Sequence, residues 1–235
     1  MSTLVADIKL ILTDPRAAWG QIEARGTPAR DAVVNHLAPL ALIPAVAQFI
    51  GASIVGVQLF GTTYRVPLLR GLVGIPLTFI VTIVSALILA AILRVLAPRF
   101  GGNDDWDRAV NLVCYGGTAA LLGGVFSILP MLSILGLVAG IYAIYTLYLG
   151  LVPMLNVDAA RRGLYLFVSL VLAFICNLIL GTVLMPFTAT PAVEDVFRSS
   201  DNSELSAEEQ MLNSLGEFGR MMQRALEEQA NQAPE

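Results

Sequence analysis

The chain has 235 residues, of which 56% are hydrophobic and only 14% are charged, and its mean hydropathy is +0.74. Soluble domains contain about 45–50% apolar and about 25% charged residues, so this composition excludes a water-soluble globule. The charges are also segregated, because four windows contain none, namely residues 32–64, 71–93, 109–157 and 163–193. Lipid rather than water is therefore expected to solvate more than half of the chain.

Residues 1–33 are expected to form short amphipathic helices at the membrane surface. One apolar face combines Leu4, Ile8, Ile11 and Leu12. Asp14 followed by Pro15 predicts a capped second helix, which carries Trp19. Such a segment can lie in the headgroup layer. Two roles stay open for it: a lid that anchors the first span, and an arm that docks a partner.

The charge-free windows predict the number of membrane crossings. A bilayer core about 30 Å thick needs about 20 apolar helical residues for each crossing. Three windows have that length, and the window 109–157 is long enough for two crossings with a turn at Pro130. Continuous rather than alternating apolar residues exclude a β-barrel. The predicted fold class is all-α, an integral membrane bundle of five transmembrane helices over residues 34–58, 72–96, 109–129, 132–152 and 164–187.

Basic residues outside these spans predict the orientation. Nine lie on the amino-terminal side of the membrane, namely Lys9, Arg16, Arg25, Arg30, Arg94, Arg99, Arg108, Arg161 and Arg162. Three lie on the other side, namely Arg65, Arg70 and Arg198. By the positive-inside rule, the amino terminus is cytoplasmic and the carboxyl terminus is outside or in a lumen.

The carboxyl-terminal tail, residues 188–235, differs from the rest because it is strongly acidic. Ser206 and Glu209 form a capping box that predicts a soluble amphipathic helix over residues 206–230. Its apolar residues recur at helical spacing, namely Met211, Leu215, Phe218, Met222 and Leu226. The negative charge disfavours an anionic lipid surface and favours packing on a protein. A solvated helix on a flexible linker is the alternative.

Small residues form two strips within the predicted spans. Gly116, Ala120 and Gly124 repeat every four residues on the third span, and Gly136 with Gly140 forms a G-x-x-x-G motif on the fourth. Such strips let helix backbones approach closely where lipid supplies no hydrophobic drive. Packing within the chain is the first expectation, and oligomerisation is the second.

Tyr142, Tyr145 and Tyr148 follow the second strip at three-residue spacing. This spacing places them along one side of the fourth span. We expect a hydrogen-bonding ridge that faces the bundle rather than a ligand cage.

The sequence offers few groups for chemistry. His36 is the single histidine and is expected to be a hydrogen-bonded anchor. Cys114 and Cys176 are expected to be small core residues, since two thiols do not complete a tetrahedral metal site. The charge-free spans also lack the intramembrane ionisable groups that ion-coupled transporters use, which disfavours proton- or sodium-driven transport.

Asp104, Asp105 and Asp107 form the one acidic cluster that could hold magnesium or a diphosphate. The alternative is a helix start, in which Asn103 or Asp104 caps the third span and the acids lie at its positive end. We expect the protein not to be an enzyme, and we expect no cofactor, no metal and no nucleic-acid partner.

Four segments carry a family resemblance, namely Asp14 to Trp19, Phe100 to Trp106, Tyr115 to Thr118 and Ile141 to Leu151. They resemble the Yip family, membrane proteins named for interaction with Ypt/Rab GTPases and also found in bacteria. The resemblance implies a five-span bundle with a cytoplasmic amino terminus. Eukaryotic members of the Yip family organise membrane traffic through protein contacts. Ala119 stands where many relatives have proline, and the acidic tail lies outside the resemblance.

The arginine-rich, lysine-poor composition favours a high-GC bacterial source, and hence an inner membrane with a periplasmic carboxyl terminus. The expected function is to organise or bind other membrane proteins, or further copies of this chain, through helix faces in the lipid bilayer. One alternative is an uncoupled carrier or scrambler of a lipid or small apolar solute, motivated by proline and glycine within the spans, namely Pro39, Pro44, Pro76 and Gly181. An enzyme that acts through the acidic cluster is the third hypothesis.

Overall fold

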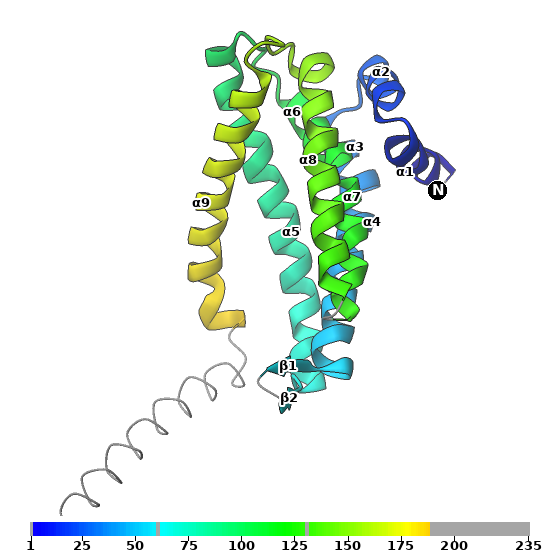
Figure 1. The fold of residues 1–235 in the computed structure, drawn as a ribbon, viewed down its shortest axis with the longest axis vertical. Helices are drawn as coiled ribbons and strands as arrows, with labels where there is room; N and C mark the ends of the chain where they lie inside the picture. The colour runs from blue at the N-terminus through cyan, green and yellow to red at the C-terminus, as the bar shows by residue number, and fades with distance from the viewer. Residues whose placement is uncertain (1, 60–61, 130–131, 189–235) are drawn as a thin grey trace, which may run out of the picture. The chain divides into compact units, whose positions relative to one another are not determined.

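The computed structural model describes residues 2–59, 62–129 and 132–188, and these form a helical bundle (Figure 1). Five helical segments are long and apolar enough to cross a membrane, namely Ala29–Val55, Leu68–Phe100, Trp106–Ile128, Ile134–Leu155 and Arg162–Leu184. The predicted all-α bundle with five spans is thus confirmed. The predicted tail helix 206–230 lies outside the described residues.

Two short helices precede the first span. Helix α1 covers Ser2–Thr13 and helix α2 covers Pro15–Arg25. The carboxylate of Asp14 caps α2 by accepting a hydrogen bond of 3.1 Å from the backbone N–H of Ala17, as predicted. Gly26, with a φ of 56°, ends α2 in the left-handed conformation that glycine adopts at low cost.

The first span is built from α3 (Ala29–Ala32), a π-helical turn (Val33–Leu37), α4 (Ala38–Phe49) and a second π-helical turn (Ile50–Val55). The first π-helical turn ends two residues before Pro39, which lacks the N–H that would bond to the carbonyl of Asn35. The local sequence therefore accounts for this departure from a regular helix.

A β-hairpin follows the first span. Strands β1 (Val57–Leu59) and β2 (Thr62–Tyr64) pair antiparallel. Gly56, with a φ of 88°, redirects the chain after the helix ends at Val55. The predicted first span instead runs to residue 58, because periodicity alone does not reveal that Gly56 adopts a conformation outside the helix.

The remaining spans differ in how deeply they are buried. The second contains α5 (Leu68–Leu96), and the third contains α6 (Trp106–Gly116), α7 (Thr118–Gly123) and a 3₁₀ turn (Gly124–Ile128). The fourth and fifth contain α8 (Ser133–Leu155) and α9 (Arg162–Thr188). The most apolar window of the third span is 61% buried, against 17% in the second and fifth. The third span is therefore central, and α5 and α9 are peripheral.

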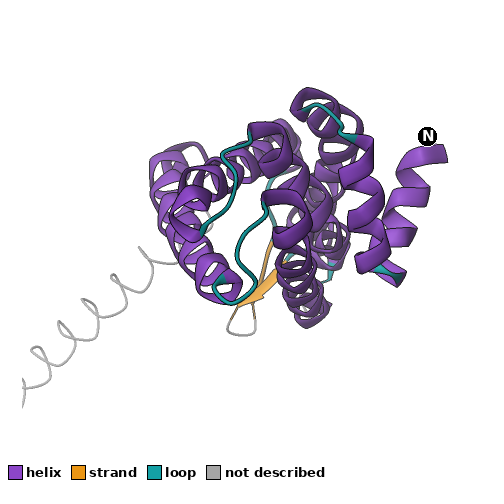
Figure 2. Ribbon diagram, turned by 90° about the horizontal axis from the view of Figure 1, so that it is seen from above, coloured by secondary structure: helices purple, strands orange, loops and turns teal. Residues whose placement is uncertain are grey.

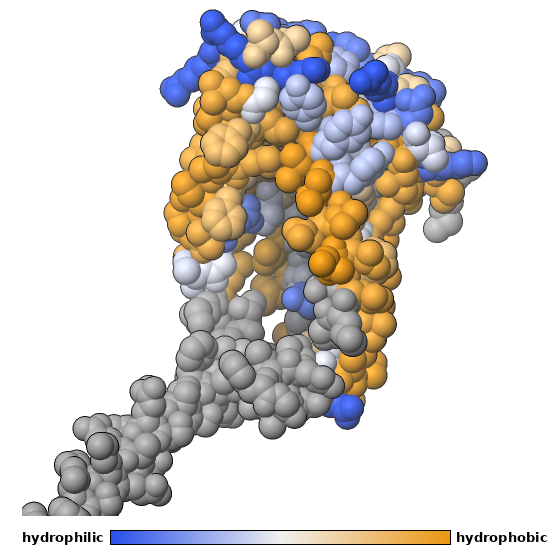
Figure 3. Space-filling view, in the orientation of Figure 1, coloured by the Kyte–Doolittle hydropathy of each residue, from blue (hydrophilic) through white to orange (hydrophobic). Residues whose placement is uncertain are grey.

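The bundle has two different ends. We call the end that holds α2 and the connections 97–105 and 156–161 the basic end, and the other, with β1 and β2, the hairpin end (Figure 1). Seen from above, α1 and α2 lie at one side of the bundle (Figure 2). The surface is apolar along the helices and hydrophilic at the basic end (Figure 3). This distribution is that of a protein with lipid around its middle.

Candidate functional site

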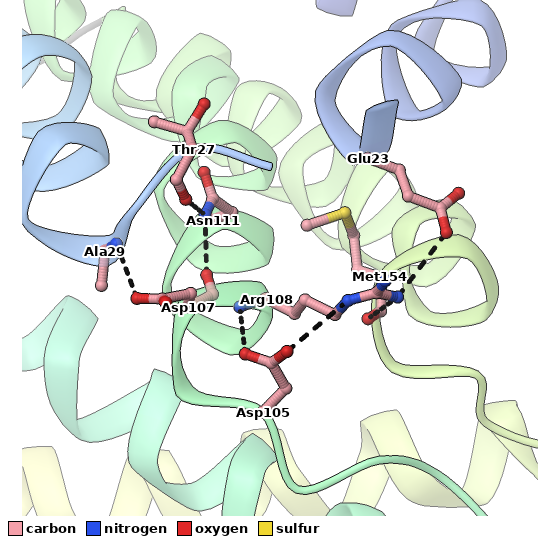
Figure 4. Close-up of polar contacts among 8 residues, drawn as sticks. All are labelled: Glu23, Thr27, Ala29, Asp105, Asp107, Arg108, Asn111 and Met154. Atoms are coloured by element: carbon pink, nitrogen blue, oxygen red, sulfur yellow. Dashed lines mark hydrogen bonds and ion pairs between the residues drawn. The ribbon is translucent and has the colours of Figure 1, made fainter. Parts of the chain in front are cut away.

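A polar junction at the basic end joins three helices (Figure 4). The carboxylate of Asp105 caps α6 by accepting a 3.1 Å hydrogen bond from the N–H of Arg108. The guanidinium of Arg108 lies 3.6 Å from carboxylate oxygens of both Asp105 and Glu23 of α2. It also donates to the carbonyl oxygen of Met154 in α8 at 3.4 Å. Arg108 therefore ties α2 and α8 to the start of α6.

The same junction fixes the linker between α2 and α3. Asp107 accepts a 2.8 Å hydrogen bond from the N–H of Ala29, the first residue of α3. The Nδ2 of Asn111 donates to the carbonyl oxygens of Thr27, at 2.6 Å, and of Asp107, at 2.7 Å. Both side chains come from the first turns of α6, so the start of this helix holds the chain where it enters the first span (Figure 4).

The three acids predicted as a cluster have separate partners. Asp104 forms an ion pair with Arg94 of α5, Asp105 caps α6, and Asp107 binds the N–H of Ala29. The prediction of Asn103 or Asp104 as the cap is wrong, because the helix begins at Trp106 and its cap is Asp105. Among the described residues, no three His, Cys, Asp or Glu side chains gather in a metal-binding arrangement.

The amino-terminal helices are fixed to each other by an ion pair. The guanidinium of Arg25 in α2 donates two hydrogen bonds, of 2.8 and 2.7 Å, to the carboxylate of Asp7 in α1. The hydrogen bond with Asp7 raises the pKa of Arg25 above its ordinary value. Asp7 is 9% exposed and the Arg25 side chain 39%, so the carboxylate of this bidentate pair is buried whereas the guanidinium reaches solvent.

Trp19 anchors α2 on the bundle. Its indole Nε1 donates a 3.0 Å hydrogen bond to the carbonyl oxygen of Thr146 in α8, and its side chain is 2% exposed. The indole lies over Gly150, where a Cβ atom would approach Cε2 of Trp19 to 2.6 Å. Gly150 therefore makes the space that the indole fills.

The single histidine is an anchor, as expected. His36 is 2% exposed, and its Nε2 lies 2.9 Å from Oγ1 of Thr118. The hydroxyl of Thr118 donates its one proton to the carbonyl of Tyr115 at 2.7 Å, so Nε2 of His36 is the donor to Thr118. The imidazole also packs against the ring of Tyr115, with centroids 4.2 Å apart and ring planes tilted by 36°. Both cysteines are free thiols, and Cys114 is buried in the core.

The third-span strip of small residues does not face one neighbour. A Cβ atom at Gly116 would lie 2.6 Å from Cδ2 of Leu147 in α8, whereas one at Gly124 would lie 2.6 Å from Cβ of Pro44 in α4. Ala120, between them, is exposed. The two glycines therefore allow contacts with different helices.

The two glycines of the G-x-x-x-G motif also differ in their surroundings. Gly136 lies against the backbone of Gly123, and a Cβ atom at Gly123 would overlap Cβ of Ala139. A Cβ atom at Gly140 would meet no heavy atom within 4 Å. Close packing of α7 and α8 therefore depends on Gly123, which the sequence patterns did not single out. The tail residues predicted for interaction, Met211, Leu215, Phe218 and Met222, lie outside the described residues.

The three tyrosines of α8 do not form one ridge. Tyr142 donates to the carbonyl oxygens of Ile11 and Leu12 at the end of α1, whereas the ring of Tyr148 lies under the guanidinium of Arg162 at the start of α9. Tyr145 is 46% exposed. A helix turns by about 100° per residue, so six residues rotate the direction by about 120°. The predicted ridge is wrong for this reason.

A stripe of uncharged polar side chains lies inside the membrane-length helices. It consists of Gln48 in α4, Thr78, Thr82 and Ser85 in α5, and Asn177 in α9, and we call it the polar stripe. The hydroxyl of Thr78 donates to Oε1 of Gln48 at 3.2 Å, and that of Ser85 donates to Oδ1 of Asn177. Charge patterning in the sequence does not reveal this stripe, because its members are uncharged. The helical spacing of Thr78, Thr82 and Ser85 was the available signal.

The stripe borders a hollow in the bundle. Helix α9 packs mainly on α5 and makes fewer contacts with α8. Figure 3 shows the surface hollowed between α9 and α8, with small hydrophilic areas inside the hollow. The inner face of α9 is buried at Leu166, Ser169 and Ala173, but it is only partly buried at Cys176 and Asn177. The hollow therefore opens beside the stripe, in the half of α9 toward the hairpin end.

Five membrane-length helices, with two short helices at one side of the bundle, define an integral membrane protein with a helical-bundle fold. The family model of the Yip1 domain matches residues 9–181, and the chain belongs to this family. Searches of curated proteins and of solved structures give no match. The predicted Yip family membership is confirmed.

Proposed function

We propose that this protein is a non-catalytic membrane protein that binds and organises other membrane proteins through its transmembrane helices. The unused amide hydrogens of Gln48 and Asn177 in the polar stripe carry the proposal. The Nδ2 of Asn177 uses one proton in a 2.9 Å hydrogen bond to the carbonyl of Ala173, and the second has no partner among the described residues. Nε2 of Gln48 has none within this part of the chain.

The depth of Asn177 identifies the kind of partner. Asn177 follows Arg162 by fifteen residues, which places it about 22 Å along α9 at 1.5 Å per residue. A hydrocarbon core of about 30 Å then surrounds it with acyl chains rather than headgroups. Acyl chains accept no hydrogen bonds, and an unpaired polar group costs free energy there. The carbonyl or side-chain oxygens of a neighbouring transmembrane helix supply the missing acceptors.

The length of the polar stripe disfavours the carrier or scrambler alternative. From Thr78 to Ser85 it extends about 10 Å along α5, a third of the hydrocarbon core. Toward the basic end the inner face of α9 is closed by the buried Leu166 and Tyr165. A lipid headgroup that crosses the membrane needs polar side chains along the whole hydrocarbon core. A contact with a partner helix needs polar side chains at one depth only. Reconstituted vesicles with flux above protein-free controls would favour the alternative.

Other positions extend the proposed contact surface. Ala120 and Gly140 are the members of the small-residue strips that the described chain leaves open, so they are proposed contact positions for a partner helix. A second copy of this chain is one such partner. The acidic tail helix is proposed as an additional contact outside the membrane.

The proposed setting is a bacterial inner membrane with the basic end in the cytoplasm. The nine basic residues that precede or join the spans on one side lie in α1, α2 and α3 and in or beside the connections at the basic end, whereas Arg65 and Arg70 lie toward the hairpin end. The positive-inside rule supports this orientation.

The non-catalytic part of the proposal is supported by the roles of the acidic side chains. Asp105 and Asp107 hold helix ends in the polar junction, and Asp104 pairs with Arg94. If the protein keeps full function after all three are replaced by Asn, the hypothesis of an enzyme that acts through these carboxylates is excluded.

Isolation of tagged protein from native membranes tests the proposed contact. The double variant Gln48→Leu, Asn177→Leu removes the free amide hydrogens, and we expect partners or oligomers to bind about 5- to 30-fold more weakly. This range corresponds to about 1–2 kcal/mol for two interhelical hydrogen bonds. Ile175→Leu on the opposite face of α9 is the matched control, and Ser85→Ala measures how much of the loss comes from the internal bond to Asn177. Unchanged partner and oligomer profiles in the double variant would contradict the proposal.

A further inference from the structure

The start of α9 carries an arginine whose polar atoms are incompletely bonded. The guanidinium of Arg162 lies 4.3 Å above the ring of Tyr148 in α8. Its Nε is shielded from solvent and has no hydrogen-bond partner among the described residues. Stacking on an aromatic face orients a guanidinium but leaves its in-plane N–H groups free. The described residues thus leave hydrogen-bonding capacity of the Arg162 guanidinium unused.

Two further arginines lie at the same corner of the basic end. Arg161 immediately precedes Arg162, and Arg99 precedes Phe100, whose ring lies 5.2 Å from that of Tyr165 in the first turn of α9. Both are exposed, and neither forms an ion pair with a described residue. We call Arg99, Arg161, Arg162 and Tyr148 the arginine corner.

Asp158 is the acidic residue of this corner, and it leaves the corner positive. Its carboxylate accepts a 3.1 Å hydrogen bond from the N–H of Ala160, and its own N–H binds the carbonyl of Phe100 at 3.4 Å. Elsewhere on this side of the protein Arg25, Arg94 and Arg108 are paired with carboxylates, whereas Arg16 and Arg30 form no ion pair with a described residue. The arginine corner thus combines three arginines with a single carboxylate, that of Asp158, which already accepts a hydrogen bond from the backbone.

The surface beside the corner is apolar. Leu164 and Phe167 in the first turns of α9 are 61% and 66% exposed, and Val171 follows at 42%. Gly163 leaves the first turn of α9 open, because a Cβ atom there would meet no heavy atom within 4 Å. An acceptor that bears negative charge and apolar chains would match both parts of this surface. Phospholipids with an anionic headgroup have that structure.

We propose that the arginine corner binds the phosphate of an anionic phospholipid, with the acyl chains along the exposed face of α9. The phosphate accepts charge-assisted hydrogen bonds from Arg162, and Arg161 and Arg99 add charge. Tyr148 keeps the guanidinium in place. This site is separate from the polar stripe, so it stands or falls independently of the proposed partner contact.

Native mass spectrometry of the full-length protein, titrated with phosphatidylglycerol or phosphatidylcholine, tests the site. We expect tighter binding of phosphatidylglycerol, and about five-fold weaker binding in Arg162→Gln and in Arg161→Gln. This ratio corresponds to about 1 kcal/mol for each basic residue at an anionic lipid surface. Arg30→Gln makes the same charge change at an exposed, unpaired arginine outside the corner and should bind as the unaltered protein does.

The variants separate this site from general surface charge. Arg161 is exposed, so Arg161→Gln keeps the test valid if Arg162→Gln fails to fold. Equal losses in Arg30→Gln and Arg161→Gln would overturn the proposal, as would equal affinity for the two lipids. Displacement of the lipid by inorganic phosphate alone at the same concentration would assign the corner to a free anion and would also overturn it.

Discussion

The hydroxyl of Ser85 in α5 donates to the amide oxygen of Asn177 in α9, and this bond joins two peripheral helices of membrane-crossing length. This bond fixes the orientation of the Asn177 amide, because Oδ1 must face Ser85 and Nδ2 then points away from it. Nδ2 keeps one proton without a partner among the described residues. The bond therefore connects the internal packing of α9 with the surface proposed for a partner helix.

Ser85→Ala is expected to loosen α9 without unfolding the bundle. The loss of one interhelical hydrogen bond in a membrane costs about 0.6 kcal/mol, up to about 1.7 kcal/mol. Hydrogen exchange of the amides in α9 should accelerate, whereas exchange in the central α6 should stay as it is. Equal acceleration in both helices would show that the bond supports the whole bundle rather than α9.

Gly123→Ala should destabilise the bundle, and Gly140→Ala should not. A Cβ atom at Gly123 overlaps Ala139, which costs about 1–3 kcal/mol for an overpacked contact. At Gly140 the same atom meets open space. Thermal unfolding in detergent measures the difference. Similar midpoints for the two variants would contradict the observed packing of α7 on α8.

Trp19→Phe should release α2 from the bundle part of the time. The variant loses the 3.0 Å hydrogen bond to the carbonyl of Thr146, worth about 1 kcal/mol, and leaves that carbonyl without the indole donor. Trypsin should then cleave faster after Arg16 and Arg25, while cleavage after Arg65 at the hairpin end serves as the control. Unchanged cleavage after the first two arginines would show that α2 is held by other contacts.

Asp105→Ala and Asp104→Asn should differ in their effect on stability. The first removes the α6 cap and costs about 0.5–2 kcal/mol. The second removes an ion pair between side chains that are 43% and 56% exposed, which contributes about 0–1 kcal/mol. Urea unfolding of the two variants provides the comparison. A larger loss for Asp104→Asn would indicate a role for this carboxylate beyond its pair with Arg94.

The sequence was sufficient for the number of spans and for the cap of α2. Both depend on local signals: charge-free lengths of about 20 residues, and Asp14 followed by Pro15. The end of the first span could not be placed in this way. The helix ends because Gly56 adopts a positive φ, and the residues around it show no change in polarity that would mark this end.

The contacts of single side chains were harder to predict, because they depend on which helices become neighbours. Gly116 and Gly124 belong to one strip in the sequence but contact α8 and α4, respectively. Asp105 rather than Asp104 caps α6, a difference of one residue that composition does not resolve. The bond between Ser85 and Asn177 spans 92 positions in the chain and has no local signal that pairs them.

A photo-cross-linking residue placed at Thr82 in native membranes tests the central claim most directly. Thr82 belongs to the polar stripe, whereas Ile80 lies about 200° around the same helix and is 55% exposed, which makes it the matched control. The proposed function predicts a protein adduct of discrete mass from position 82 and none from position 80. Lipid adducts alone at position 82, or the same protein adduct from both positions, would contradict it.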